Sequence, residues 1–461
     1  MIPLTLAEIA DATGGTLDHI TDPHTRVTGP LSFDSRHVAP GGLFACLAGS
    51  TVDGHAFAAQ AVRDGAVAAL TTRPVDAPAI IVPDVLDAMG RIATAVAAAY
   101  TGTVIALTGS AGKTSTKDIL ETVLSQHGPT AANERSFNNE IGFPVTVSRV
   151  MPDSRYLVLE MGARGKGHIA SLCQMARPRI ATVLGIGSAH VGEFGSQLAI
   201  ADAKAEIVRA LPDHGVAILN GDDPLVAAMV HDTSAQVLLF GTGSHCDVRA
   251  EEISVNSHGQ PNFTLHHGHH HSLVQLRVHG RHNVTNALAA AATAIAAGVP
   301  FDRIVTGLTE AELSSGARME ILQRADGVTI INDAFNASPE SVIAALDALA
   351  DMAGTNRRSV AVLGEMAELG DDAPAWHDKV ADKVLAVGVD RLIGIGGAHT
   401  LRMIGTVREG SGHATEADST IPLAQHVNTL LQPHDVVLVK GANALGLEAT
   451  ARELAGMCTT R

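Results

Sequence analysis

The chain has 461 residues, of which 46% are hydrophobic and 17% are charged, a composition that is typical of ordered globular domains and excludes a largely disordered chain. Its formal net charge of −16 excludes a global positive field for nucleic acid or an anionic membrane, so an anionic ligand would need a local pocket of backbone amides and a few cationic side chains. The length corresponds to about three domains.

The first residues predict a helix rather than a targeting segment. Thr5 and Glu8 have the spacing of a capping box, and Gly14 follows as a helix end. The segment lacks the basic start and apolar core of a signal peptide, and the alanine-rich segment 287–297 is too short to cross a membrane. The four cysteines are far apart and form no CxxC pair, as is typical of a reducing compartment. We therefore expect a cytoplasmic protein without membrane insertion.

Apolar runs alternate with helix-like segments along most of the chain. The first part mixes short apolar strands with loops rich in Gly, Asp and Pro, whereas a regular alternation starts near residue 101 and starts again near residue 315. This alternation predicts an α/β fold with parallel, doubly wound sheets. We expect a smaller N-terminal α/β domain (1–100), a central P-loop-type domain (101–314) and a C-terminal Rossmann-like domain (315–461).

The sequence TGSAGKTS follows the apolar run TVIAL and precedes a helix-like segment. This is the context of a phosphate loop, although Leu107 stands where the usual P-loop pattern has its first glycine. Backbone amides and the helix N-terminus would bind phosphate, Lys113 would reach the β and γ oxygens, and Thr114 would offer a hydroxyl to Mg²⁺. The alternative is a purely structural turn. The loop residues expected to contact a nucleotide are Thr108, Gly109, Ser110, Ala111, Gly112, Lys113, Thr114 and Ser115.

Other polar residues follow strands that would end at the same edge of the central sheet. Glu160, His190 and the pair Asp222–Asp223 each come after an apolar run. In parallel α/β sheets ligands bind at the carboxyl ends of the strands, and carboxylate and imidazole groups beside a triphosphate suit Mg²⁺ coordination. Each residue alone is more typical of a loop or cap, and only their convergence on one edge of the sheet favours a site.

The histidine-rich sequence HHGHHH spans residues 266–271, between two segments in which apolar residues alternate. No regularly spaced Cys or Asp accompanies these histidines, so the pattern does not match a metal site. We interpret the segment as the exposed tip of a β-hairpin.

Six longer motifs occur in order between residues 108 and 290: TGSAGKTSTK, ERSFNNEIGFP, LEMGARGKGHI, GSAHVGEFGS, AKAEI and GRHNVTNALAA. Together they resemble the Mur ligases, the ATP-dependent amide-forming enzymes of peptidoglycan synthesis. The phosphate loop of that family runs TGxxGKT, which accounts for Leu107. Three further stretches, DSRHVAPGGLF, NDAFNASPESVIAAL and VLGEMAELG, are most similar to the members that add D-alanyl-D-alanine.

The resemblance implies four sets of site residues. The catalytic residues would be Lys113, His190, Lys204 and Arg318. The metal ligands would be Thr114, Glu160, His190 and Lys204. The nucleotide contacts outside the phosphate loop would be Asn283, Asn286, Arg318 and Asp333. The contacts with the uridine nucleotide, the muramyl peptide and the dipeptide would be Ser35, Arg36, Asn138, Asn139 and Asn336.

Lys204 matches a lysine that is carbamylated in several Mur ligases. A carbamate at this position would turn a cation into an anion able to bind a second Mg²⁺. The alternative is an ordinary helix-surface lysine paired with Glu206 or other nearby acids.

Two stretches of the C-terminal part depart from the family pattern. Phe335 stands where the family usually has Tyr, so a hydroxyl that would donate to a ligand is missing. The stretch from Lys440 to Glu448 is looser than the KGSR-like stretch that is usual near the end. Both departures fall in the domain expected to bind the dipeptide.

The resemblance implies a monomeric cytoplasmic ligase that uses ATP and Mg²⁺. The terminal carboxylate of a UDP-MurNAc-tripeptide would be phosphorylated, and D-alanyl-D-alanine would attack the acyl phosphate. The alternatives are a tripeptide-forming Mur ligase, a folylpolyglutamate synthase, a P-loop ATPase acting as a binding module, and an inactive scaffold. Tripeptide-forming members usually carry a DNP motif, which is absent from this sequence. Folylpolyglutamate synthases lack the domain that carries the DSR motif.

Overall fold

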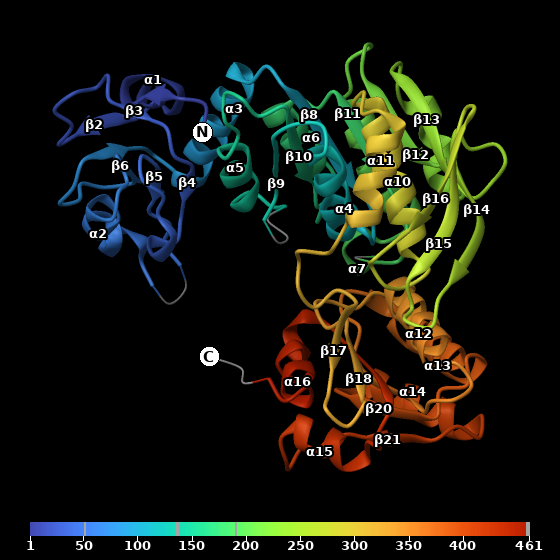
Figure 1. The fold of residues 1–461 in the computed structure, drawn as a ribbon. Coiled ribbons are helices and arrows are strands. Elements are labelled where there is room, and N and C mark those ends of the chain that lie inside the picture. The colour runs from blue at the N-terminus through green and yellow to red at the C-terminus, as the bar shows by residue number, and fades with distance from the viewer. Residues whose placement is uncertain (50–51, 135–137, 190, 458–461) are drawn as a thin grey trace.

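The computed structural model describes residues 1–49, 52–134, 138–189 and 191–457. The chain has the predicted α/β fold, with three main sheets that follow one another from the blue to the red end of Figure 1. Over these ranges, none of the helices combines the length and apolar character that a membrane crossing requires.

The N-terminal part contains a five-stranded sheet with the order β2-β7-β6-β5-β4 and a small two-stranded sheet, β1-β3. The strands are β1 (Leu4–Thr5), β2 (Thr16–Asp18), β3 (Arg26–Val27), β4 (Leu31–Ser32), β5 (Leu43–Ala45), β6 (Ala68–Thr71) and β7 (Ala79–Ile81). The helices are α1 (Leu6–Thr13), α2 (Ala58–Arg63) and α3 (Val85–Ala99), with short 3₁₀ helices η1 (Ser35–His37) and η2 (Gly54–Phe57). The predicted capping box of α1 is confirmed, because Thr5 and Glu8 each accept a hydrogen bond from the other's backbone amide.

The central part contains a nine-stranded sheet with the order β16-β15-β14-β13-β12-β11-β8-β10-β9. Its strands are β8 (Thr103–Thr108), β9 (Thr130–Ala132), β10 (Tyr156–Glu160), β11 (Ile180–Val183), β12 (Val216–Asn220), β13 (Gln236–Gly241), β14 (Val248–Val255), β15 (Pro261–His267) and β16 (His270–Gln275). Neighbours from β9 to β14 are parallel, whereas β14, β15 and β16 are antiparallel. The histidine segment forms the predicted hairpin tip, and the described residues hold no group of three or more His, Cys, Asp or Glu suited to a metal ion.

Helices cover both faces of this sheet (Figure 1). They are α4 (Lys113–Ser125), α5 (Gly142–Val147), α6 (His168–Ala176), α7 (Val191–Phe194), α8 (Gln197–Arg209), α9 (Pro224–Ala227), η3 (Ala228–Asp232), α10 (Asn283–Ala296) and α11 (Phe301–Glu310). Val104 and Ala106 of β8 pack into one core, and Ile105 and Leu107 pack into the core on the opposite face. Burial on both faces explains why β8 is a continuous apolar run.

Small residues let helix α4 lie close to its neighbours α10 and α11. Helix α10 packs against α4 and also against the sheet, and its Ala287 and the run 289–292 are fully buried. Gly307 of α11 faces Val123 of α4, where an added Cβ would lie 2.6 Å from the Val123 Cα. These contacts set the depth at which α4 lies against the sheet.

The C-terminal part contains a six-stranded sheet with the order β17-β18-β22-β19-β20-β21, parallel except for the edge strand β17. The strands are β17 (Glu320–Gln323), β18 (Thr329–Asn332), β19 (Ser359–Gly364), β20 (Arg391–Ile395), β21 (Ala414–Glu416) and β22 (Val436–Lys440). The helices are α12 (Pro339–Ala353), α13 (Ala373–Ala386), α14 (Ala398–Glu409), α15 (Leu423–Leu430) and α16 (Leu447–Leu454), with 3₁₀ helices η4 (Gly370–Asp372) and η5 (Asn443–Leu445).

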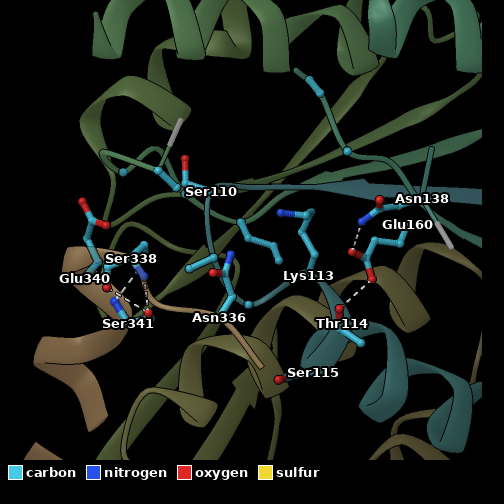
Figure 2. Close-up of a pocket in the computed structure, with 18 of the residues that line it drawn as sticks. Ser110, Lys113, Thr114, Ser115, Asn138, Glu160, Asn336, Ser338, Glu340 and Ser341 are labelled. Atoms are coloured by element: carbon cyan, nitrogen blue, oxygen red, sulfur yellow. Dashed lines mark hydrogen bonds between the residues drawn. The ribbon is translucent and has the colours of Figure 1, made fainter. Parts of the chain in front are cut away.

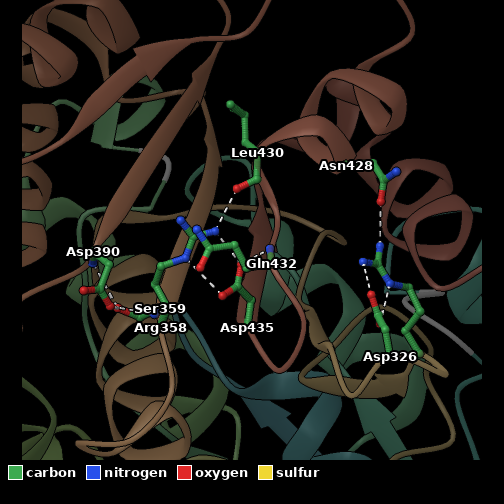
Figure 3. Close-up of polar contacts among 9 residues, drawn as sticks. Asp326, Arg358, Ser359, Asp390, Asn428, Leu430, Gln432 and Asp435 are labelled. Atoms are coloured by element: carbon green, nitrogen blue, oxygen red, sulfur yellow. Dashed lines mark hydrogen bonds and ion pairs between the residues drawn. The ribbon is translucent and has the colours of Figure 1, made fainter.

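Polar contacts join the amino ends of these strands (Figure 3). Arg358 donates from Nε and Nη2 to the two carboxylate oxygens of Asp435, at 3.0 and 2.6 Å, and the backbone amide of Gln432 donates to the same carboxylate at 2.8 Å. Asp390 accepts from the backbone amide and the hydroxyl of Ser359, at 2.7 and 2.9 Å. This end of the sheet is therefore closed by charge-assisted hydrogen bonds.

Three cysteines, Cys46, Cys173 and Cys246, are buried free thiols. Burial raises the pKa of both Cys46 and Cys173 to about 12. Cys458 lies outside the described residues. The described thiols thus behave as small buried apolar groups, in line with the sequence-based interpretation.

Candidate active site

A cavity of about 1010 Å³ lies where the central and C-terminal parts meet, and Figure 2 shows part of its wall. Of the predicted site residues, those that line it are Ser110, Ala111, Gly112, Lys113, Thr114, Ser115, Asn138, Asn139, Glu160, Lys204, Asn286, Arg318, Asp333 and Asn336. Among the described residues, those predicted for the site but absent from this wall are Ser35, Arg36, Thr108, Gly109 and Asn283. His190 lies outside the described residues.

The predicted strand–loop–helix context of the phosphate loop is confirmed. Strand β8 ends at Thr108 and helix α4 begins at Lys113. Gly112 has a φ of 80°, and a Cβ there would lie 2.4 Å from the Asn286 side chain, so this position needs glycine. Lys113 Nζ donates to the Gly109 carbonyl at 2.8 Å, and burial lowers its pKa while the charge of Glu160 acts in the opposite direction. The ammonium therefore lies inside the loop, where a phosphate would bind.

Glu160 links the phosphate loop to the asparagine-rich segment (Figure 2). Its side chain accepts from Thr114 Oγ1 at 2.9 Å and from Asn138 Nδ2 at 2.7 Å. Glu160 is only 1% exposed, and its backbone amide donates to Asn133 at 2.6 Å. A hydroxyl and a carboxylate held together in this way form a hard oxygen donor set of the kind that Mg²⁺ prefers.

Lys204 of α8 lines the cavity and is only 5% exposed. Burial, together with the positive charge of Lys113, lowers its pKa to about 7. Glu206 does not pair with it, because the Glu206 carboxylate accepts from the backbone amides of Gly167 and Ala170 at the start of α6, at 2.6 and 2.9 Å. The interpretation of Lys204 as a surface lysine paired with Glu206 is therefore wrong.

The C-terminal part contributes a charged wall opposite the phosphate loop. The guanidinium carbon of Arg318 lies 3.9 Å from the centre of the Phe335 ring, so Phe335 supports the arginine by a cation–π contact. Lys440, the last residue of β22, donates to the Asp333 carboxylate at 2.5 Å and to the Asn336 carbonyl at 3.0 Å. Lys440 therefore fixes the loop that carries both predicted ligand contacts.

Two predicted asparagines have structural partners. Asn139 accepts from the backbone amide of Gly142, the first residue of α5, at 3.0 Å, and it also borders the cavity. Asn283 is fully buried, and its Oδ1 accepts from Asn286 Nδ2 at 2.7 Å. Asn283 thus orients Asn286, which forms part of the wall.

The predicted uridine-site residues lie in the N-terminal part, in η1. Arg36 donates from Nε and Nη2 to the two carboxylate oxygens of Asp34, at 2.9 and 2.7 Å, and the Arg36 side chain is exposed. The charge-assisted contact lowers the pKa of Asp34. Ser35 begins the same 3₁₀ helix, whose amino end is capped by Asp34.

Several lining residues were not predicted as site residues, among them His282, Glu340, Glu368 and Lys440. His282 directly precedes the predicted Asn283, and burial lowers its pKa. Lys440 is a charged residue at the end of an apolar strand, as is Glu160. Glu340 and Glu368 lie in stretches that carry the family resemblance, and nothing in the sequence separates their side chains from the neighbouring residues.

Three Mur ligase family models match the chain. The model described as "Mur ligase family, catalytic domain" matches residues 30–99, "Mur ligase middle domain" matches 107–294, and "Mur ligase, glutamate ligase domain" matches 317–443.

Similar proteins match over almost the full length of the chain. Two curated relatives, from Mycobacterium tuberculosis strain H37Rv and Escherichia coli strain K12, are named UDP-N-acetylmuramoyl-tripeptide–D-alanyl-D-alanine ligase. The first is 44% identical over 98% of each chain, and the second is 36% identical over 98% of this chain and 99% of the relative. A crystal structure of MurF from Acinetobacter baumannii has a TM-score of 0.86 at 32% identity and covers 98% of this chain and 99% of its own. The MurF ligase from Thermotoga maritima in complex with ADP has a TM-score of 0.79 at 26% identity and covers 93% and 98%.

Proposed function

Because this chain belongs to the Mur ligase family, we propose that it joins D-alanyl-D-alanine to a UDP-MurNAc-tripeptide while ATP is converted to ADP and phosphate. One observation carries this function: the phosphate loop with its Thr114–Glu160 pair faces Arg318 and Asp333 of the C-terminal part across one cavity. Such an arrangement brings a nucleotide and a second substrate together, as amide formation requires.

The proposed reaction requires charge neutralisation at the phosphates. A carboxylate is a poor electrophile until it is phosphorylated, and negative charge develops on the transferring phosphoryl group. Lys113 from the loop and Arg318 from the opposite wall supply positive charge from two sides. Mg²⁺ held by Thr114 and Glu160 would supply further charge neutralisation at the phosphate oxygens.

We propose that Lys204 is carbamylated in the working enzyme. Its amine is buried in the same wall as Lys113, so the two positive charges repel each other. A carbamate would replace this repulsion by attraction and would provide oxygen atoms for a second Mg²⁺. Intact-mass measurement of the wild-type chain and of Lys204→Met tests this, since only the wild type should carry the added mass of one CO₂.

We propose that the chain divides into residues 1–100, 101–314 and 315–461, with the first part holding the uridine end of the substrate through Ser35 and Arg36. The muramyl peptide would reach the phosphate loop past Asn138 and Asn139. The loop of Asn336 would hold the dipeptide while the C-terminal part keeps water out of the site. We expect the enzyme to act as a monomer in the cytoplasm.

A phosphate-release assay with ATP, UDP-MurNAc-tripeptide and D-alanyl-D-alanine tests this function. We expect release that depends on both peptide substrates, together with a new amide product detected by mass spectrometry. Replacing the dipeptide by a single diamino acid or by glutamate distinguishes the other ligases of the superfamily. ATP hydrolysis that is independent of both peptides would contradict the proposal and favour an ATPase module. Lys113→Met is the matched inactive control.

A further inference from the structure

The loop from Leu184 to Ser188 follows β11 and is held by backbone contacts from several elements. Inside the central part, Asn220 Nδ2 donates to the Leu184 carbonyl at 2.7 Å. The Asp223 carboxylate accepts from the Ile186 amide, also at 2.7 Å. The phosphate loop contacts it too, because the Ser110 amide donates to the Gly185 carbonyl at 2.9 Å. The loop is therefore a rigid neighbour of the phosphate loop.

Glu340, from the first turn of α12, contacts the same loop across the domain boundary. Its Oε1 accepts from the Ser188 amide at 2.7 Å. Its other oxygen, Oε2, is buried without a hydrogen-bond partner in the described part of the chain. Figure 2 shows Glu340 beside Ser338 and Ser341, which form the capping box of α12. A buried carboxylate with one oxygen unpaired is costly, so a contact that needs this carboxylate is expected to have a function.

The approach between Glu340 and the loop depends on Gly187. A Cβ at this position would lie 2.9 to 3.0 Å from three atoms of the Glu340 carboxyl group, which are the nearest atoms to it. Gly187 does not have a positive φ, so its backbone conformation accepts alanine. Glycine is therefore needed at residue 187 because any side chain there would collide with the Glu340 carboxylate.

A second contact between the same two parts lies farther along the chain. The Gly192 amide donates to the Glu368 carbonyl at 3.2 Å. A Cβ on Gly192 would lie 2.7 Å from the Gly370 amide nitrogen. The two parts thus approach closely at two glycines, but only the Glu340 contact involves a charged side chain and a loop bonded to the phosphate loop.

We propose that Glu340 is a positioning residue for the ligase reaction. It holds the loop 184–188 against α12 and so fixes the phosphate loop relative to the domain that carries Arg318 and Asn336. The inference rests on the proposed function, because the register of these groups matters only if a phosphorylated acid on one side meets an amine on the other. A misplacement of about 1 Å at such a site is enough to slow the reaction about 100-fold.

A double-mutant cycle between Glu340 and Gly187 tests the proposal. We expect Glu340→Ala to lower kcat about 10- to 100-fold, the range for loss of a hydrogen bond to a charged group, with KM for ATP changed by less than about twofold. Glu340→Gln keeps an oxygen acceptor for the Ser188 amide, so its kcat should fall less than that of Glu340→Ala. Gly187→Ala should lower kcat in the wild-type background because its methyl group collides with the carboxylate. It should have little effect in the Glu340→Ala background, where that group is gone.

Asp390→Asn is the matched control, since Asp390 also accepts a backbone amide in the C-terminal part but at the far end of the sheet. Its kcat should equal that of the wild type. The proposal is overturned if Glu340→Ala keeps kcat within about twofold of the wild type at equal folded fraction. It is also overturned if Gly187→Ala lowers kcat by the same factor in both backgrounds. Thermal unfolding of each variant gives the folded fraction. Failure of the wild type to form an amide product would instead contradict the proposed function.

Discussion

Strand β22 has an ion pair with a buried member at each end, and the two pairs differ in their surroundings. At the amino end, Asp435 is 2% exposed and pairs with Arg358, and Gln432 completes its hydrogen bonds. At the carboxyl end, Lys440 is 3% exposed and pairs with Asp333. The first pair is enclosed by turns, whereas both members of the second pair line the cavity.

The comparison shows that charged residues at one end of the sheet stabilise the fold, whereas charged residues at the other end also orient groups of the site. Both pairs fix neighbouring strands, but only the carboxyl end of a parallel sheet faces the crevice in which ligands bind. A charge at the amino end therefore serves folding alone. A charge at the carboxyl end also orients groups that would touch a substrate, here Asp333 and the Asn336 loop. Substitutions at the two ends should accordingly change different observables.

The largest effect should come from Asp435→Ala, which leaves Arg358 without its carboxylate. We expect the C-terminal part to lose about 3 kcal/mol of unfolding free energy, the low end of the range for breaking a buried pair, because the Arg358 side chain that remains is 23% exposed. Urea unfolding followed by fluorescence measures this directly, since Trp376 in α13 is the one tryptophan of the sequence. Activity per folded molecule should stay unchanged. The double variant Arg358→Met, Asp435→Leu should be more stable than Asp435→Ala, because it leaves no unpaired charge. An unfolding free energy as low as that of Asp435→Ala would contradict the ion-pair explanation.

Lys440→Met should mainly lower activity rather than stability. Asp333 and the Asn336 carbonyl lose their shared donor, so we expect kcat/KM for the dipeptide to fall about 30-fold, or about 2 kcal/mol. Steady-state phosphate release at saturating ATP measures it. The proposed difference between the two ends would be contradicted if Lys440→Met lowered the unfolding free energy as much as Asp435→Ala does and left kcat/KM unchanged.

Phe335→Leu should have a smaller effect at the carboxyl end. Leucine keeps the apolar contact but removes the ring face beneath Arg318, and a cation–π contact of about 1 kcal/mol corresponds to about a fivefold loss in kcat. Phe335→Tyr keeps the ring and restores the residue usual in the family, so its kcat should match the wild type. Equal losses in both variants would show that the ring does not act through Arg318.

The smallest effect should come from Arg324→Ala at the amino end. The Arg324 guanidinium beside Asp326 lowers the pKa of that carboxyl to about 2, and it also donates to Asn428 at 2.7 Å (Figure 3). The pair therefore stabilises the fold above pH about 4, and this contribution is lost as the pH falls towards 2. The difference in Tm between wild type and variant should shrink over this range. A difference in Tm that stays constant from pH 5 to pH 2 would show that the stabilisation does not come from the ionised Asp326.

The sequence predicted those parts whose causes are local. The run around Val104–Leu107 is buried on both faces, so it appeared as a continuous apolar strand, and the glycines before Lys113 marked the loop. The capping box at Thr5 and Glu8 was equally visible, because both partners lie within one turn.

Other site residues could not be predicted because their partners are distant in the sequence. Glu340 is separated from Ser188 by 152 residues, and an acid in the first turn of a helix is already explained by the helix dipole. Lys440 lies 107 residues from Asp333. Asn283 and Asn286 were both predicted from the family resemblance, but only the packing of α10 decides that Asn286 borders the cavity while Asn283 is fully buried.

The alanine-rich face of α10 has a consequence beyond the site itself. Because methyl groups set how deeply α4 lies, the position of Lys113 depends on side-chain volumes in a helix layer that never meets a nucleotide. A larger side chain in place of a buried alanine that contacts α4 would displace that helix by steric pressure. Natural variants with every ligand-contacting residue intact would then still differ in nucleotide affinity, and a survey restricted to those residues would overlook them.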